Sequence, residues 1–101
     1  MLVIAGRFKV LESARAELLA AGSTMAAASR NEPGCIDYRL SIDVDDPLTM
    51  QILEQWESQA ALDAHFATTH FAEFSGVLMT TIDGGADFSR YEVSASGPLF
   101  G

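Results

Sequence analysis

The chain has 101 residues, of which 49% are hydrophobic and 20% are charged, and its formal net charge is −8. This length suits one domain with one hydrophobic core, and an acidic balance spread along the chain argues against nucleic acid or an anionic membrane surface as a partner. A single cysteine excludes an internal disulfide, no apolar run approaches the roughly 20 residues that cross a bilayer, and the opening residues lack a secretory signal pattern, so we expect a cytoplasmic protein.

The first half of the chain predicts a strand, a long helix and a second strand. Leu2 to Val10 alternates with the period of a strand, and Gly6 in its middle indicates the close approach of another group. Apolar residues recur at helical spacing from Leu11 to about Ser29. The Asn-Glu-Pro-Gly sequence at 31–34 stops this helix, and Cys35 to Ile42 alternates again as a half-buried strand.

The second half predicts a hairpin, two helices and a last strand. An acidic turn at 43–47, most simply a solvated loop, leads into a third strand from Thr49 to Glu57. Ser58 is a favourable N-cap for a short helix to about Ala67. After a break at Thr68-Thr69, a further helix is expected from about His70 to Thr81.

The end of the chain contains a glycine turn, a strand and a tail. We expect Asp83-Gly84-Gly85 to end the last helix and the fourth strand to cover about Ala86 to Val93. Residues 94–101 are rich in Ser, Gly and Pro, so they are predicted to be loose or to pair with another subunit. The domain is therefore expected to cover residues 1–93.

The order of strand, helix, strand, strand, helix pair and strand is that of the split βαβ arrangement. It predicts a ferredoxin-like α+β domain with a four-stranded antiparallel sheet and the helices on one face. The other face of the sheet would be bare in a monomer, and the apolar content is high for so small a monomer. Both observations favour a homodimer that pairs face to face.

The corner between the third strand and the next helix is the candidate site. Trp56 ends a run in which Met50, Ile52 and Glu54 share its face, and His65 follows on the short helix. His70 opens the next turn. The one Trp and both His residues of the chain therefore converge on this corner.

Several motifs here resemble one known family. They are EPGC at 32–35 followed by Tyr38, EQWES at 54–58, Ala-Leu at 61–62, Ala-His at 64–65, and His70. Together they are similar to the antibiotic biosynthesis monooxygenase family, and residues 54–70 resemble its quinol monooxygenases in particular. The resemblance implies a dimeric α/β barrel with one pocket per subunit between helices and sheet. It also implies oxidation of phenols, quinols or polycyclic hydroxyaromatics by molecular oxygen without metal or flavin.

A cofactor-free oxygenase needs a deprotonated, electron-rich substrate, and four residues are assigned to that task. Trp56 could stack on the ring or donate its indole N–H, and His65 could accept the phenolic proton. Arg7 could hold the anion if its strand face lies under the helices, and Tyr38 could donate to the same oxygen. The remaining predicted substrate contacts are the apolar walls and the pocket rim: Met25, Phe66, Phe71, Phe74 and His70.

Each assignment has a structural alternative. Trp56 and Tyr38 are compatible with core or interface packing, and His65 with a buried, hydrogen-bonded helix residue. Arg7 could pair with one of the many carboxylates. Its presence where haem-degrading relatives are expected to carry Asn argues against haem chemistry.

No metal or cofactor is predicted. The two His residues are five apart across a helix break, which is not the i, i+4 spacing of two ligands on one helical face, and no cysteine cluster accompanies them. Cys35 is better explained as a small buried residue than as a nucleophile.

Three functional hypotheses remain open. The first is a cofactor-independent monooxygenase acting on a quinol-like or polycyclic hydroxyaromatic with oxygen. The second is a protein that binds or isomerises a small metabolite without oxygen, since the family includes an isomerase of a phosphorylated signalling sugar. The third is a haem enzyme or carrier. Fold similarity fixes the architecture far better than the reaction.

Overall fold

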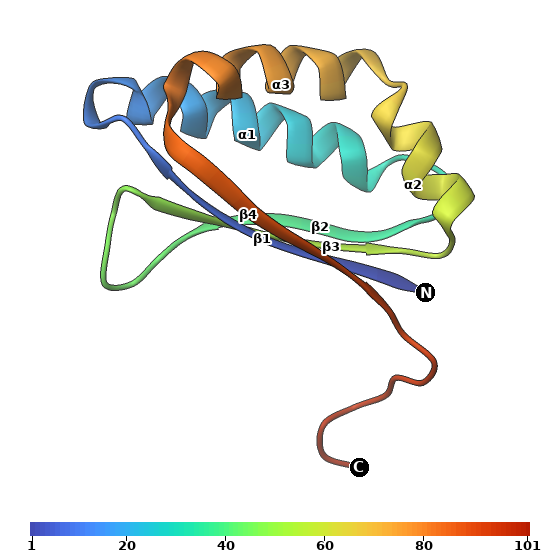
Figure 1. The fold of residues 1–101 in the computed structure, drawn as a ribbon. Coiled ribbons are helices and arrows are strands. Elements are labelled where there is room, and N and C mark those ends of the chain that lie inside the picture. The colour runs from blue at the N-terminus through green and yellow to red at the C-terminus, as the bar shows by residue number, and fades with distance from the viewer.

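The computed structural model describes residues 1–101 and contains four strands and three α-helices (Figure 1). The elements are, in chain order, β1 (Leu2–Val10), a 3-10 turn η1 (Glu12–Ala14), α1 (Arg15–Arg30), β2 (Cys35–Ile42), β3 (Thr49–Trp56), α2 (Gln59–Phe66), α3 (Thr69–Thr81) and β4 (Ile82–Glu92).

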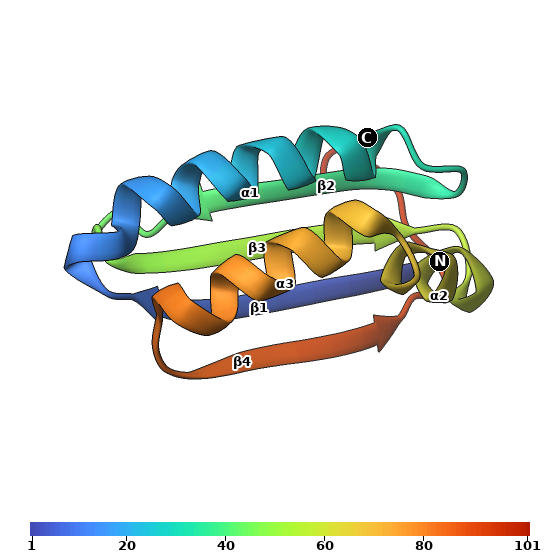
Figure 2. The same ribbon diagram turned by 90° about the horizontal axis from the view of Figure 1, so that it is seen from above.

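The strands form one antiparallel sheet in the order β2-β3-β1-β4. All three helices lie on one face of it, and the opposite face is uncovered (Figures 1 and 2). This is the ferredoxin-like α+β fold that the order of elements predicts. No helix is both long enough and apolar enough to cross a membrane.

The core lies between the sheet and the helices. On β3 the even-numbered residues face the helices, and Met50, Ile52 and Trp56 are all buried there. Gly22 of α1 lets the helix approach β2 closely, because a Cβ at this position would lie 2.2 Å from the Cδ2 atom of Leu40. The tight α1–β2 contact closes one side of the core.

Two hydroxyl side chains define the corner between β3, α2 and α3. The Ser58 Oγ accepts a hydrogen bond from the Ala61 N–H at 3.2 Å, and the Thr68 Oγ1 accepts one from the Phe71 N–H at 3.2 Å. Each satisfies a backbone donor that the first turn of a helix otherwise leaves free. The break between α2 and α3 at Thr68 is therefore specified locally.

The prediction for the last strand was wrong at its start. Asp83, Gly84 and Gly85 do not separate α3 from the strand, because β4 begins directly at Ile82. Val10 pairs with Ile82 and Phe8 pairs with Ala86, so the segment of β4 between Ile82 and Ala86 is longer than the segment of β1 that it faces. The glycines belong to this bulge, where Gly84 adopts φ +90°.

The remaining boundaries differ from expectation by little. The first helix begins with the 3-10 turn and extends as α1 to Arg30, and α3 begins at Thr69. Residues 94–101 form no helix or strand and run away from the domain (Figure 1). Leu99 and Phe100, near the end of this tail, are each 88% exposed.

Candidate functional site

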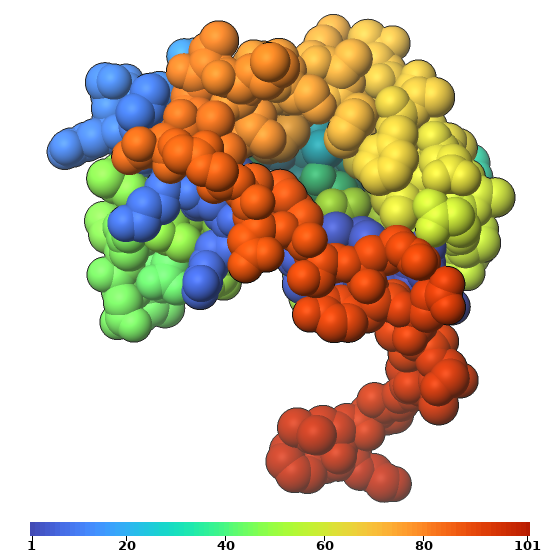
Figure 3. Space-filling view, in the orientation of Figure 1, coloured from blue at the N-terminus to red at the C-terminus, as the bar shows by residue number.

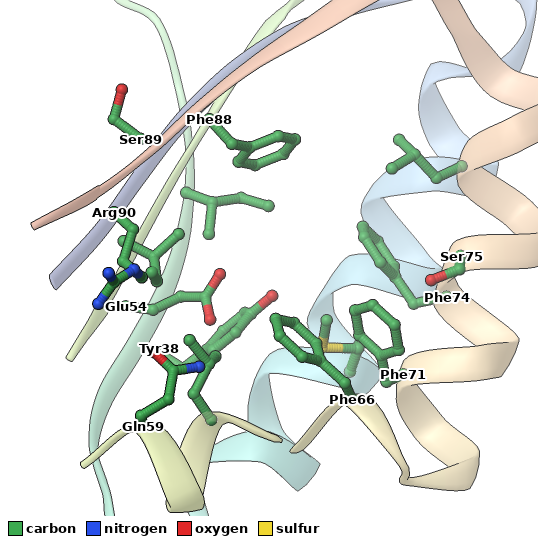
Figure 4. Close-up of a pocket in the computed structure, with 15 residues that line it drawn as sticks. Tyr38, Glu54, Gln59, Phe66, Phe71, Phe74, Ser75, Phe88, Ser89 and Arg90 are labelled. Carbon is green, nitrogen blue, oxygen red and sulfur yellow. The ribbon is translucent and has the colours of Figure 1, made fainter. Parts of the chain in front are cut away.

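A cavity of about 420 Å³ lies between the sheet and the helices α2 and α3. The space-filling view shows the surface hollowed between β4 and the helices (Figure 3). Ten of the fifteen lining residues are hydrophobic, so the interior suits an apolar ligand. Phenylalanine rings come from three elements: Phe66 of α2, Phe71 and Phe74 of α3, and Phe88 of β4 (Figure 4).

Gly6 of β1 allows the Phe88 ring to lie over the sheet. A Cβ at Gly6 would lie 1.9 Å from the Phe88 Cδ1 atom, so any other residue here would displace the ring. The close approach predicted from Gly6 is therefore confirmed, and the approaching group is a wall of the cavity.

Glu54 is the carboxylate of this cavity. It lies two residues before the end of β3, where Tyr38 of β2 and Ile4 of β1 are its cross-strand neighbours, and only 7% of its surface is exposed. The Trp56 Nε1–H donates a hydrogen bond to the Glu54 Oε1 at 2.9 Å. Burial raises the pKa of Glu54 to about 7; the Trp56 hydrogen bond opposes this rise and the nearby charge of Glu32 adds to it.

Tyr38 brings a hydroxyl to the same place. Its side chain lines the cavity, and its hydroxyl lies between the Glu54 carboxyl and the Phe66 ring (Figure 4). Burial, with Glu54 as the next cause, raises the pKa of Tyr38 above its usual value. The hydroxyl therefore stays protonated at neutral pH and is available as a donor.

Trp56 and His65 lie together but behind the cavity wall. Their ring centroids are 4.8 Å apart, and their exposed fractions are 0% and 1%. Neither lines the cavity. The role of proton acceptor predicted for His65 lacks the substrate contact that it requires, because the ring is enclosed by Tyr38, Phe66 and Phe71.

Glu32 occupies the polar side of His65. Its Oε2 lies 2.7 Å from the His65 Nδ1 and 2.8 Å from the His70 Nε2, so one carboxylate oxygen is shared by both imidazoles. His70 was predicted to serve either the structure or the pocket rim, and it does not line the cavity. This cluster ties the loop between α1 and β2 to α2 and α3.

Arg7 lies on the opposite side of the sheet from the cavity. In β1 it pairs with Gln51 and Asp87, and it shares the uncovered face with Arg39. Arg7 was predicted to hold the substrate anion only if its strand face lay under the helices, and this condition is not met. For the same reason Arg7 gives no evidence against haem, since its side chain does not face the pocket.

Arg90 is the arginine that does reach the cavity. It lies two residues after Phe88 on the same face of β4, lines the cavity, and is paired with Glu92 at 3.2 Å. Its side chain is 47% exposed. It therefore lies where the cavity meets solvent.

The model of the antibiotic biosynthesis monooxygenase family matches residues 1–76, a segment that runs from β1 into α3. The chain belongs to the antibiotic biosynthesis monooxygenase family. The matched segment carries Tyr38, Glu54 and Phe66, whereas Phe88 and Arg90 lie beyond it.

Two other proteins are similar to this chain in sequence. It is 31% identical over 94 residues to the Bacillus subtilis protein named "Putative monooxygenase YcnE", and the match covers 93% of this chain and 99% of YcnE. It is 40% identical over 73 residues to the Synechocystis protein named "Uncharacterized protein sll1783", with 72% of this chain covered. The chain spans only 50% of that second protein's length.

Solved structures share the fold of this chain. A Deinococcus radiodurans structure described as a putative antibiotic biosynthesis monooxygenase superposes with a TM-score of 0.90 at 24% identity over 100% of both chains. PA3566 from Pseudomonas aeruginosa superposes with a TM-score of 0.84 at 26% identity, covering 93% of this chain and 94% of its own.

Sequence reasoning missed Glu54 as a residue of this cavity. A signal was present, because Glu54 shares an alternating face with Met50, Ile52 and Trp56, and a carboxylate on a core-facing strand is unusual. Of the predicted substrate contacts, Met25, Phe66, Phe71 and Phe74 do line the cavity.

Burial raises the pKa of Cys35 to about 11, so its thiol stays protonated at neutral pH.

Proposed function

We propose that this protein oxidises a phenolic or quinol-like aromatic with molecular oxygen, without a metal or organic cofactor, and that Glu54 accepts the phenolic proton. The observation that carries the proposal is a buried carboxyl with a pKa of about 7 that faces a cavity walled by phenylalanines. A base is most effective when its pKa lies near the operating pH. Glu54 meets this condition within the cavity, and His65 lies outside it.

The proposed reaction begins with proton transfer. The phenolic O–H bond breaks, the proton passes to the Glu54 carboxylate, and the phenolate that remains is electron-rich enough to reduce oxygen. The substrate supplies all four electrons: one oxygen atom ends in the product as a quinone carbonyl, and the other leaves as water. A phenol with a free para C–H position balances as phenol plus O₂ giving quinone plus water.

The side chains around Glu54 support that step in different ways. The protonated Tyr38 hydroxyl is placed to donate to the developing phenolate oxygen. The rings of Phe66, Phe71 and Phe88 exclude water and offer faces on which an aromatic substrate can pack. Trp56 acts through Glu54 as a positioning residue, because its N–H fixes one carboxylate oxygen.

The proposed test is oxygen uptake by chelator-treated protein with a panel of phenols, naphthols and quinols. We expect uptake with at least one substrate, and a loss of about 10²- to 10⁴-fold in kcat for Glu54→Gln. Glu57→Gln is the matched control, because Glu57 is an exposed carboxylate that does not line the cavity. The proposal fails if no substrate supports uptake, or if Glu54→Gln and Glu57→Gln are equally active.

We also propose that the protein is a homodimer that pairs through the uncovered face of the sheet. Leu53 of β3 and Tyr91 of β4 are 47% and 54% exposed on that face, beside Ala5 of β1. Apolar exposure at the centre of a sheet favours burial against a second copy. Size-exclusion chromatography with light scattering should give a dimer for the natural chain and a monomer for Leu53→Glu; a monomeric natural chain would contradict the proposal.

A further inference from the structure

Glu32, His65 and His70 form a compact cluster outside the cavity. They come from the loop after α1, from α2 and from the first turn of α3. One ligand-type atom of each lies within 4.8 Å of the other two. The contact distances are 2.7 Å from the Glu32 Oε2 to the His65 Nδ1 and 2.8 Å from the same oxygen to the His70 Nε2.

From these positions, we propose that Glu32, His65 and His70 form a binding site for one divalent transition-metal ion of the zinc type. Two imidazole nitrogens and one carboxylate oxygen are the donor set of zinc sites that keep a fourth position for water. The spacing of His65 and His70 in the sequence does not by itself indicate a metal site. The third ligand comes from 33 residues before His65, so helical spacing alone does not reveal the site.

Room for the ion requires both contacts of Glu32 to open and the two imidazole nitrogens, which lie within 4.8 Å of each other, to take up tetrahedral spacing. In the metal-free form a carboxylate can only accept, so each imidazole nitrogen that faces Glu32 carries a proton. A metal ion takes the place of these two protons, which move to the opposite ring nitrogens. Zinc bonds of about 2.0–2.2 Å in tetrahedral geometry separate ligand atoms by about 3.3 Å, so each contact must open by about half an ångström.

The surroundings give the ion a way in and a closed inner side. The His65 side chain is 1% exposed, Glu32 is 10% exposed and His70 is 23% exposed. An ion and its water ligand would therefore enter from the His70 side. Two neutral imidazoles and one carboxylate give a Zn²⁺ complex a net charge of +1, which the surplus of carboxylates on a chain of net charge −8 offsets.

The proposed site is separate from the proposed reaction. None of its three residues lines the cavity, so a bound ion would not touch the substrate. Its effect would be to join the 31–34 loop to α2 and α3. Metal binding can therefore be measured without any substrate, and the oxygenase test uses chelator-treated protein, so either proposal can fail alone.

The test is a Zn²⁺ titration of the chelator-treated full chain by calorimetry, with Co²⁺ absorption as a second readout of coordination. We expect one ion per chain and weaker binding by at least about 100-fold in Glu32→Gln and in His70→Gln, since loss of even an outer partner of a ligand costs about 10- to 100-fold. Glu17→Gln removes an exposed carboxylate of α1, changes the net charge equally, and should bind like the natural chain.

Circular dichroism of each variant separates loss of the site from loss of the fold. If Glu32→Gln does not fold, His70→Gln decides, because that side chain is partly exposed and its replacement disturbs less packing. Absence of binding at micromolar zinc, or equal binding by His70→Gln and Glu17→Gln, would overturn the proposal. A Co²⁺ spectrum of the natural chain without imidazole-ligated, four-coordinate character would overturn it as well.

Discussion

Glu54 is buried and Glu32 is half-buried, and the two glutamates lie in very different surroundings. The Glu54 carboxyl faces an apolar cavity and receives one side-chain hydrogen bond, from the Trp56 N–H. A single oxygen of Glu32 serves both His65 and His70, away from the cavity. The Glu54 carboxyl can still accept a hydrogen bond or a proton from a ligand in the cavity. The Glu32 carboxyl instead joins three segments of the chain through its two histidine contacts. Environment, and not residue type, therefore separates a candidate base from a structural or metal-binding group.

The largest expected effect is on turnover, and it sharpens this contrast directly. Glu54→Gln should lower kcat by about 10²- to 10⁴-fold because the amide cannot take a proton. Glu32→Gln should keep kcat within about tenfold, because Glu32 does not line the cavity. Both are measured by oxygen uptake at a temperature at which circular dichroism finds the variants folded. Equal losses in the two variants would erase the distinction between the two carboxyls.

The second prediction concerns stability, for which Glu32 is expected to matter. Glu32→Ala removes the acceptor for two imidazole donors, of which the one on His65 is almost fully buried. An unsatisfied buried donor costs about 1–3 kcal/mol and a lost charged hydrogen bond a similar amount. We expect a loss of about 3 kcal/mol in the free energy of unfolding, measured with urea at pH 7.

Glu17→Ala is the matched control, because Glu17 is exposed on α1. It should change the free energy of unfolding by less than about 0.5 kcal/mol. A loss for Glu32→Ala no larger than that of the control would mean that the two imidazoles find other partners.

The sequence was sufficient to predict the fold but only half of the site. Alternation placed Glu54 and Trp56 on one face of β3, Ser58 predicted the start of α2, and Thr68-Thr69 predicted the helix break, because these signals are local. Depth is not local. Trp56 and His65 do meet, with ring centroids 4.8 Å apart, but neither lines the cavity.

Arg7 illustrates a second limit. Both faces of β1 contain apolar residues, so alternation alone does not decide which face is covered by helices. The decision rests on register, in which Gly6 pairs with Ile52 of β3 and Phe88 of β4. Glu32 illustrates a third, because its meeting with His65 joins residues 33 apart, and no periodicity encodes such a contact.

The third prediction uses the pH dependence of stability. The ordinary pKa of 4.5 applies to Glu54 in the unfolded chain, and burial raises it to about 7 in the fold. Between these values the native state binds more protons than the unfolded state, so the contribution of Glu54 is fully present below about pH 4.5 and is lost as pH rises through about 7. The total is up to about 3 kcal/mol at 1.36 kcal/mol per pKa unit.

Urea denaturation of the natural chain and Glu54→Gln from pH 4 to pH 8 measures this loss. The difference between the two free energies of unfolding removes the contributions of all other groups. We expect the natural chain to lose stability relative to Glu54→Gln across this range. A difference that stays constant with pH would mean that folding does not shift the pKa of Glu54. The pKa would then not distinguish Glu54 from Glu32.

The smallest expected effect tests how Trp56 acts on Glu54. Its N–H stabilises the charged carboxylate and so holds the pKa of Glu54 below the value that burial alone would set. Trp56→Phe removes this donor and keeps an aromatic ring against His65, so the pKa of Glu54 should rise by about one unit.

The base must be ionised to act, so activity rises with pH through the pKa of Glu54, and the acidic limb of kcat/KM should move to higher pH in Trp56→Phe by the same amount. Glu32→Gln should move it the other way, because the charge of Glu32 raises that pKa. Packing alone would lower kcat/KM at every pH without moving the limb. Opposite shifts in the two variants would establish that Trp56 and Glu32 act on one ionisation from two sides, whereas an unmoved limb in Trp56→Phe would leave the indole as a core residue and nothing more.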